Sequence, residues 1–258
     1  MAIRGKSSSL EESTRNGPPA AVLVSGGIDS AVLTAELCDS HTAVFPLFIR
    51  GGLLWEHAEL EHLQRFLDRV ARPELQPLQL LDQPVRDVYG DHWSVTGLDV
   101  PDAQSPDGAV FLPGRNLFLV AKAAVWCVLH QVEILALGSL HSNPFPDSTP
   151  EFDRRLEQLV RQALSSPFCI VRPFAKMSKS DVVHRGANLP LEWTFSCIRP
   201  VGGMHCGTCN KCAERRSGFA QARVSDPTLY ADREPKIEGR GPKTADRRPR
   251  AEDRSSST

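Results

Sequence analysis

The segment VLVSGGIDS, residues 22–30, combines the residue types that a phosphate-binding turn needs. An apolar run ends at Ser25, two glycines follow, and Asp29 stands where a helical pattern begins. Glycines let backbone N–H groups approach a ligand closely, and the first turn of a helix attracts anions. Ser25 and Ser30 add hydroxyl donors. Asp29 suits such a site only if it binds a metal or caps the helix, and a magnesium ion bridging phosphates would account for it.

The alternative to a ligand site is a tight strand-to-helix turn with Asp29 as its N-cap. The segment matches neither G-x-x-x-x-G-K-[ST], because no lysine follows, nor G-x-G-x-x-G. The full string S-G-G-x-D-S directly after an apolar run favours nucleotide binding over a plain turn.

Four of the seven cysteines lie within residues 197–212, with the spacing C-x8-C-x2-C-x2-C. Two residues between cysteines let both thiolates reach one ion, so the spacing favours a tetrahedral structural zinc site. An iron–sulfur cluster and a redox pair remain alternatives. A zinc ribbon for nucleic acid is a further alternative, but aromatic residues are scarce around Lys211, Arg215 and Arg216. His205 adjoins a cysteine and is interpreted as a bystander. The expected metal ligands are Cys197, Cys206, Cys209 and Cys212.

The remaining cysteines, Cys38, Cys127 and Cys169, stand among apolar residues and are interpreted as small core side chains. An odd number of cysteines, with no apolar stretch typical of a signal peptide, favours a reducing cytoplasmic location. The sequence has no run of about 18 apolar residues, so no membrane span is predicted. The net charge of −1 argues against a strongly cationic nucleic-acid binder.

The elements that must position these groups alternate along the chain. Apolar, β-branched runs predict strands, and the stretches between them have helical patterns. This alternation predicts an α/β fold with a doubly wound, Rossmann-like parallel sheet. A long loop is expected over 83–110. The expected strands are 20–25, 43–50, 75–81, 133–140 and 168–174, and the expected helices are 29–39, 55–71, 115–131, 152–164 and 178–187.

Composition divides the chain into four parts. Residues 1–18 are polar and are expected to form a disordered leader. Residues 19–190 form the α/β domain, and residues 191–225 form a metal-binding region packed on it. Residues 232–258 mix both charges with almost no apolar residue and are expected to be a disordered tail.

The S-G-G-x-D-S string resembles the pyrophosphate loop of the N-type ATP pyrophosphatases, which have an adenine nucleotide alpha hydrolase (HUP-like) fold and adenylate carbonyl oxygens. Three further blocks occur in the order found in the 7-cyano-7-deazaguanine synthase family, and together they span most of the chain. These blocks are VFLPGRNLFLVAKAA (110–124), PFAKMSKSDVV (173–183) and TFSCIRPVGGMHCGTCNKCAERRSGF (194–219).

The resemblance implies that ATP activates 7-carboxy-7-deazaguanine as an acyl adenylate. Ammonia would convert the adenylate to an amide, and a second activation would dehydrate the amide to the nitrile. The implied cofactors are one structural zinc ion per chain and ATP with Mg²⁺ as co-substrate. No membrane or nucleic-acid partner is implied, and a homodimer would be unsurprising.

The motifs also assign roles to individual residues. Asp29, Arg115 and Lys179 are the expected catalytic residues, the latter two as phosphate or carboxylate clamps. Arg115 could instead merely begin a helix, and Lys179 could be a surface lysine. The expected ATP-binding residues are Val24, Ser25, Gly26, Gly27, Ile28, Asp29, Ser30, Ala31, Val32, Leu33, Thr34 and Asn116.

Two segments depart from the family pattern. GSLHSNPFPD (138–147) is two residues shorter than the family's G-x-x-E-T-D-x-S-G-Y-P-D, although Asp147 keeps its place. WEHAELE (55–61) resembles the family's R-H-x-x-E only at His57. His57 and Asp147 are the expected contacts to the acceptor. A different carboxylate, a tRNA thiolase and a nucleic-acid-binding protein with a vestigial nucleotide fold remain alternatives.

Overall fold

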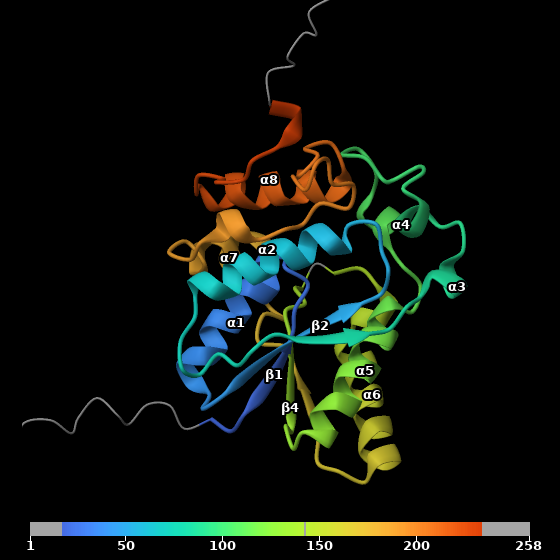
Figure 1. Cartoon of the computed structure of the whole chain (residues 1–258), viewed down its shortest axis with the longest axis vertical. Coiled ribbons are helices and arrows are strands. Elements are labelled where there is room, and N and C mark those ends of the chain that lie inside the picture. The colour runs from blue at the N-terminus through green and yellow to red at the C-terminus, as the bar shows by residue number, and fades with distance from the viewer. Residues whose placement is uncertain (1–16, 142, 234–258) are drawn as a thin grey trace, which may run out of the picture.

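The computed structural model describes residues 17–141 and 143–233, and within them the strands form one parallel sheet with the order β3-β2-β1-β4-β5 (Figure 1). The first strand lies at the centre, and the order reverses beside it, as in a doubly wound sheet. The α/β prediction is therefore confirmed. The strands are β1 (Ala20–Leu23), β2 (Val44–Arg50), β3 (Gln79–Asp82), β4 (Ile134–Leu137) and β5 (Cys169–Val171).

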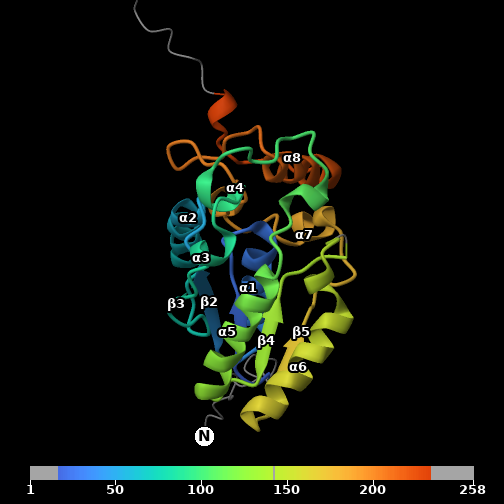
Figure 2. The ribbon, with the colours of Figure 1, turned by 90° about the vertical axis from the view of Figure 1, so that its right-hand side faces the viewer.

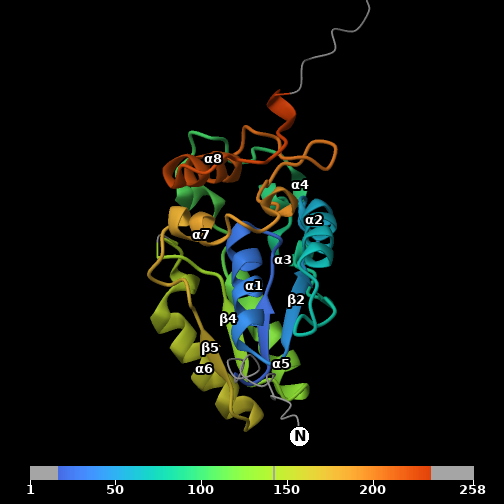
Figure 3. The ribbon, with the colours of Figure 1, turned by 90° about the vertical axis from the view of Figure 1, so that its left-hand side faces the viewer.

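Helices cover both faces of the sheet (Figures 2 and 3). One face packs against α1 (Ile28–Ser40), α2 (Glu56–Arg69) and α7 (Lys179–Arg185), and the other packs against α5 (Arg115–Leu129) and α6 (Pro150–Leu164). The alternation of side chains along β1 explains this division, because Val22 belongs to the first core and Ala21 to the second. Each of these helices overlaps its predicted range. None of the helices in the described ranges has both the length and the apolar character to cross a bilayer.

The C-terminal region adds a helix that the sequence patterns did not predict, α8 (Asn210–Ala222). It lies across the end of the sheet at which the strands finish (Figure 1). Arg215 fixes it there: this side chain is 1% exposed and donates to Thr228 Oγ1 at 2.6 Å, Thr194 Oγ1 at 2.9 Å and the Leu191 carbonyl at 2.9 Å. Full hydrogen bonding offsets much of the cost of burying a guanidinium.

The predicted long loop contains short helical turns and is tied to its surroundings. It holds α3 (Arg86–Tyr89), α4 (Trp93–Thr96) and the 3-10 turn η1 (Asp107–Val110). Trp93 stacks on Trp55, the N-cap of α2, with 5.6 Å between ring centroids. Further along, Ala103 N–H donates to the Thr208 carbonyl at 3.0 Å. The segment is therefore an ordered wall rather than an open loop.

Two expected boundaries shift by two residues. Gly17 pairs with His41 as an isolated bridge, which places residues 17–18 with the α/β domain. Asp232 accepts a hydrogen bond from Arg216 at 2.7 Å, which places residues 232–233 with the C-terminal region. The rest of the expected leader and tail lies outside the described residues.

Candidate active site and metal centre

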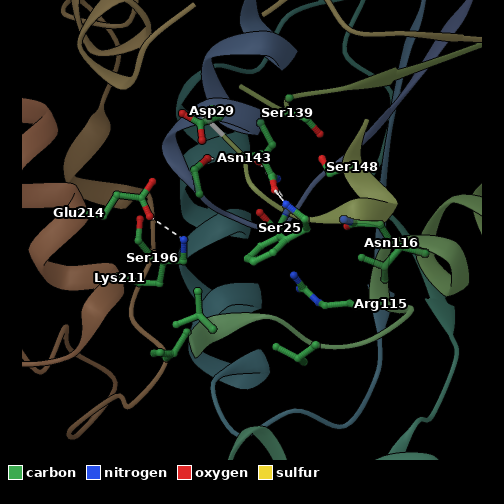
Figure 4. Close-up of a pocket in the computed structure, with 18 of the residues that line it drawn as sticks. Ser25, Asp29, Arg115, Asn116, Ser139, Asn143, Ser148, Ser196, Lys211 and Glu214 are labelled. Atoms are coloured by element: carbon green, nitrogen blue, oxygen red, sulfur yellow. Dashed lines mark hydrogen bonds and ion pairs between the residues drawn. The ribbon is translucent and has the colours of Figure 1, made fainter. Parts of the chain in front are cut away.

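A cavity of about 790 Å³ opens at the C-terminal ends of the strands, where the order of the sheet reverses. Segments from across the chain form its walls: the β1–α1 turn, the first turns of α2 and α5, residues 138–140, 143–145 and 147–148, and α8. Arg115 and Asn116 lie on one side of this cavity, and Lys211 and Glu214 lie on the opposite side (Figure 4).

The turn at Gly26 and Gly27 is shaped by contacts that exclude larger residues. Gly26 has a φ of +76°, and a Cβ there would lie 2.9 Å from the Glu59 carbonyl oxygen. The Gly26 carbonyl accepts a hydrogen bond from Phe195 N–H at 2.7 Å. Gly27 is the N-cap of α1, and no side chain caps this helix. Asp29 is therefore not the N-cap, and the first N–H groups of α1 lie at the cavity, where an anion would bind.

Four charged side chains of alternating sign lie along one side of the cavity. Lys179 Nζ lies 2.6 Å from Asp29 Oδ2 and 3.4 Å from Glu214 Oε1, and Lys211 Nζ lies 2.6 Å from Glu214 Oε2. Burial lowers the pKa of Lys179, but Asp29 and Glu214 outweigh it and leave the pKa raised. Burial raises the pKa of Glu214, but Lys179 and Lys211 bring it down to about 2. Lys179 and Glu214 therefore carry their charges at neutral pH.

Asp29 has one carboxylate oxygen available for a ligand. Its Oδ2 accepts from Lys179, whereas its Oδ1 is buried without a hydrogen-bond partner among the described residues. A buried carboxylate oxygen needs a donor or a cation. The aspartate therefore fits the magnesium role expected of it.

The first turn of α5 brings Arg115 and Asn116 to the cavity. Asp147 accepts from Asn116 N–H at 3.0 Å and from Asn116 Nδ2 at 3.2 Å, so both of its oxygens hold the start of this helix. Asp147 also lines the cavity, so it positions α5 there, and its predicted contact with the acceptor stays a prediction. Arg115 lines the cavity, and its buried Nε has no hydrogen-bond partner among the described residues. This guanidinium is available to an anion.

His57 does not line the cavity and is exposed on α2. Glu56 and Glu59 line it instead. A helix turns about 100° per residue, so residues 57 and 59 differ by about 200° and face nearly opposite directions. Glu56 Oε2 accepts from Gly51 N–H and from Gly52 N–H, which fixes the loop after β2. The sequence pattern thus pointed to a helix that lines the cavity, but to an exposed residue of that helix, and a contact of His57 with the acceptor stays a prediction.

Glu59 is half-buried, and burial raises its pKa to about 8; Arg115 lowers this pKa and Glu56 raises it further. An unfolded glutamate titrates near pH 4.3. The folded state therefore holds this proton more tightly, and the resulting stability is full below pH 4.3 and lost as the pH rises through about 8. Relative to Glu59→Gln, the wild-type free energy of unfolding should fall by about 2 kcal/mol between pH 5 and pH 9, after a discount for partial exposure.

Urea denaturation of both proteins at the two pH values measures this difference. Glu61→Gln, a partly exposed carboxylate on the same helix that pairs with Arg65, is the matched control and should show no such trend. A pH-independent difference between wild type and Glu59→Gln would contradict the raised pKa.

The predicted ATP-binding run divides between the cavity and the core. Val24, Ser25, Gly27, Ile28, Asp29 and Ser30 line the cavity. Gly26 supports the turn from behind. The last four residues do not line it: Ala31, Val32 and Leu33 are at most 1% exposed, and buried Thr34 donates to the Ser30 carbonyl at 2.7 Å. Once α1 is under way, its side chains pack on the sheet, so only its first turn can reach a ligand.

The four predicted metal ligands converge. All four Sγ atoms lie within 4.8 Å of one another and are buried. The Cys197–Cys209 and Cys206–Cys212 separations are 3.8 and 3.9 Å, and a tetrahedron with metal–sulfur bonds of about 2.3 Å has sulfur–sulfur edges of about 3.8 Å. The thiolates therefore fit a single tetrahedral ion. His205 is a bystander, because its Nε2 accepts from Ser196 N–H at 3.1 Å.

Segments on either side of the cysteines reach the cavity. Asn210 Nδ2 donates to the Ser105 carbonyl at 2.9 Å. The backbones of Asp102 and Cys209 form an isolated antiparallel β-bridge. Ser196, Lys211 and Glu214 line the cavity beside cysteine ligands. The metal centre therefore anchors one wall of the candidate active site.

Sequence reasoning missed Glu59, Ser196, Lys211 and Glu214. For the last two, a helical pattern after Cys209 was the available signal, because residues 211, 214, 215 and 218 share one helix face. Glu59 gave no such signal, since its orientation depends on how α2 packs.

Comparison with known proteins places the chain in a family. The model of the "Queuosine biosynthesis protein QueC" family matches residues 19–223. A 7-cyano-7-deazaguanine synthase of Methanothrix thermoacetophila is 30% identical over 227 residues, covering 82% of this chain and 98% of the relative. One from Xanthomonas oryzae pv. oryzae is 32% identical over 224 residues, covering 82% of this chain and 97% of the relative.

Among solved structures, a 4-thiouridine synthetase–RNA complex with bound ATP covers 80% of this chain and 50% of its own, with 15% identity and a TM-score of 0.42, which is too low to carry a conclusion. The family match extends over the α/β domain and all four cysteines. The chain belongs to the queuosine biosynthesis QueC family.

Proposed function

We propose that this chain is an ATP-dependent carbon–nitrogen ligase that converts 7-carboxy-7-deazaguanine and ammonia to 7-cyano-7-deazaguanine through an acyl adenylate. The observation that carries the proposal is one cavity that joins the Gly26–Gly27 turn to Arg115 and Lys179. The names of relatives that match nearly their whole length support the choice of substrate.

The chemistry requires activation of a poor electrophile. A carboxylate oxygen is a bad leaving group, and transfer of AMP to it creates a good one. Ammonia then displaces AMP to give the amide, and a second adenylation on the amide oxygen lets AMP leave as the nitrile forms. In each round, the protein positions the reactants and stabilises phosphate charge.

The cavity supplies donors for that charge. The first N–H groups of α1, with the hydroxyls of Ser25 and Ser30, would bind the phosphates that leave as pyrophosphate. Arg115, with its free Nε, and Lys179 would neutralise charge that develops on the α-phosphate and the acyl oxygen. Side chains on opposite sides of the cavity would thus converge on the reacting phosphorus.

Two metal ions belong to the proposal. Asp29 would hold magnesium through Oδ1, and the ion would neutralise phosphate charge when bound with ATP. Cys197, Cys206, Cys209 and Cys212 would hold one zinc ion as a structural site, since four thiolates leave no open position. The proposed magnesium ligand and the proposed zinc ligands are different residues.

The proposed reaction has a direct test. Purified protein with ATP, Mg²⁺, ammonia and 7-carboxy-7-deazaguanine should form AMP and pyrophosphate and yield a product with the mass of the nitrile. Chromatography quantifies the nucleotides, and mass spectrometry identifies the product. An absence of acceptor-dependent AMP at every ammonia concentration would overturn the substrate assignment.

A different carboxylate is the second candidate, and the 138–147 segment favours it. Phe145 stands where the family has tyrosine, and the family's glutamate and first aspartate are missing. A panel of heteroaromatic carboxylates in the same AMP assay separates the two candidates. A tRNA thiolase is not supported, because none of the described residues that line the cavity is a cysteine.

A further inference from the structure

We propose that Glu214 is a positioning residue. When Asp29 binds magnesium, the ammonium group of Lys179 leaves Asp29 and pairs with Glu214. This inference rests on the proposed function, in which Asp29 holds the ion that accompanies ATP. It assigns to α8 a part in nucleotide binding as well as in the metal centre.

The surface of α8 is shaped to receive the Lys179 side chain. A Cβ at Gly218 would lie 2.5 Å from Lys179 Cγ, so only glycine leaves room for this stem. Glu214 lies one turn earlier on the same face of α8, and its Oε1 is 3.4 Å from Lys179 Nζ. The stem therefore crosses the helix at Gly218, and its ammonium group ends beside Glu214.

Lys179 is shared unequally between two carboxylates. It lies 2.6 Å from Asp29 and 3.4 Å from Glu214, so Asp29 is the closer partner in the absence of nucleotide. A cation on Asp29 would repel this ammonium group at short range. An ammonium group left without a partner in the cavity wall would be costly, and Glu214 supplies one at a distance that a rotamer change can close.

Lys211 keeps Glu214 in place while Lys179 moves. Its Nζ holds the second oxygen of Glu214 at 2.6 Å, which leaves the first oxygen for Lys179. Lys211 and Glu214 lie in the first turns of α8, which begins at the metal centre. Glu214, the new partner of the displaced lysine, is thus held in place by the helix that begins at the cysteine cluster.

The test is the magnesium dependence of ATP binding, measured calorimetrically on the full chain without acceptor or ammonia. In Glu214→Gln, the displaced lysine lacks a charged partner. The Mg²⁺ concentration for half-maximal ATP binding should therefore rise at least about fivefold, because the two equilibria are linked. ATP binding without Mg²⁺ should change less than about twofold, since Lys179 then stays at Asp29.

Glu36→Gln is the matched control, because Glu36 of α1 pairs with Arg185 of α7 at 2.8 Å on the exposed side of the same two helices. It should leave both constants unchanged. Glutamine keeps the size of Glu214 and one acceptor oxygen, and unchanged zinc content with an unchanged thermal midpoint verifies that α8 is intact.

Each of the following outcomes would overturn the proposal. An equal loss of ATP affinity with and without Mg²⁺ would show a general structural role, and no change in either would show that Glu214 is dispensable. Wild-type protein that binds no ATP would refute the proposed function and this inference with it. Mg²⁺-dependent ATP binding that Glu214→Gln leaves unaltered would refute this inference alone.

Discussion

Asparagine in place of Asp29 is expected to lower acceptor-dependent AMP formation at least about 100-fold, the cost typical of removing one group that stabilises transition-state charge. The substitution keeps the shape of the side chain but removes its negative charge. The buried Oδ1 then loses its affinity for a cation, and Lys179 loses its closer partner. Initial rates of AMP formation over a range of Mg²⁺ concentrations measure the effect.

The same substitution should spare the fold. The Asp29 side chain does not cap α1, and it lies at the cavity rather than in the apolar core. Circular dichroism and the thermal midpoint should therefore match those of wild type, as should those of the surface control Glu36→Gln. Activity within tenfold of wild type would contradict a metal-binding role for Asp29.

Removal of the metal is expected to have the second large effect. Structural zinc in small domains contributes about 10 kcal/mol or more, and this binding energy is folding energy. The four thiolates here are buried against one another, so an empty cluster would be left without its main cohesive contact. The walls built on residues 194–197 and α8 should then lose their structure. AMP formation should fall to background because Phe195 and Lys179 lose their supports.

Metal analysis, circular dichroism and limited proteolysis follow this loss in Cys206→Ser and after treatment with a chelator. The native protein should contain about one zinc ion per chain. Cys169→Ser, a thiol in β5 outside the cluster, is the control and should retain metal and activity. A preparation dominated by iron, with visible absorbance, would refute the zinc assignment, and a fully active metal-free protein would refute its structural role.

The elements of the α/β layer could be predicted from the sequence because each gives a local signal. For the helix expected at 178–187, the signal is the S-x-x-D spacing of Ser178 and Asp181, which form a capping box at the start of α7. The apolar run 20–25 forms a strand that ends at Leu23, shortly before the glycine turn. Residues 83–110 gave no periodic signal, since their order depends on distant partners, such as Thr208 for Ala103.

The candidate site was predictable where chemistry and spacing coincide. The four cysteines and the glycine turn are of this kind, since each depends on residues of fixed type that lie close together in the sequence. The surroundings of Asp147 and His57 show the limit of such local signals. The helix that Asp147 holds, and the face of α2 that turns inward, depend on tertiary packing that no local pattern encodes.

The hydrogen bond from Phe195 to Gly26 has a consequence for how the protein is made. The glycine turn leaves the ribosome well before the segment that braces it, because that segment lies much later in the sequence. The early part of the chain can pair its strands, but it cannot close the turn against a partner that has not yet been synthesised. The turn is therefore braced only after the segment that carries Cys197, the first cysteine of the cluster, has also been synthesised.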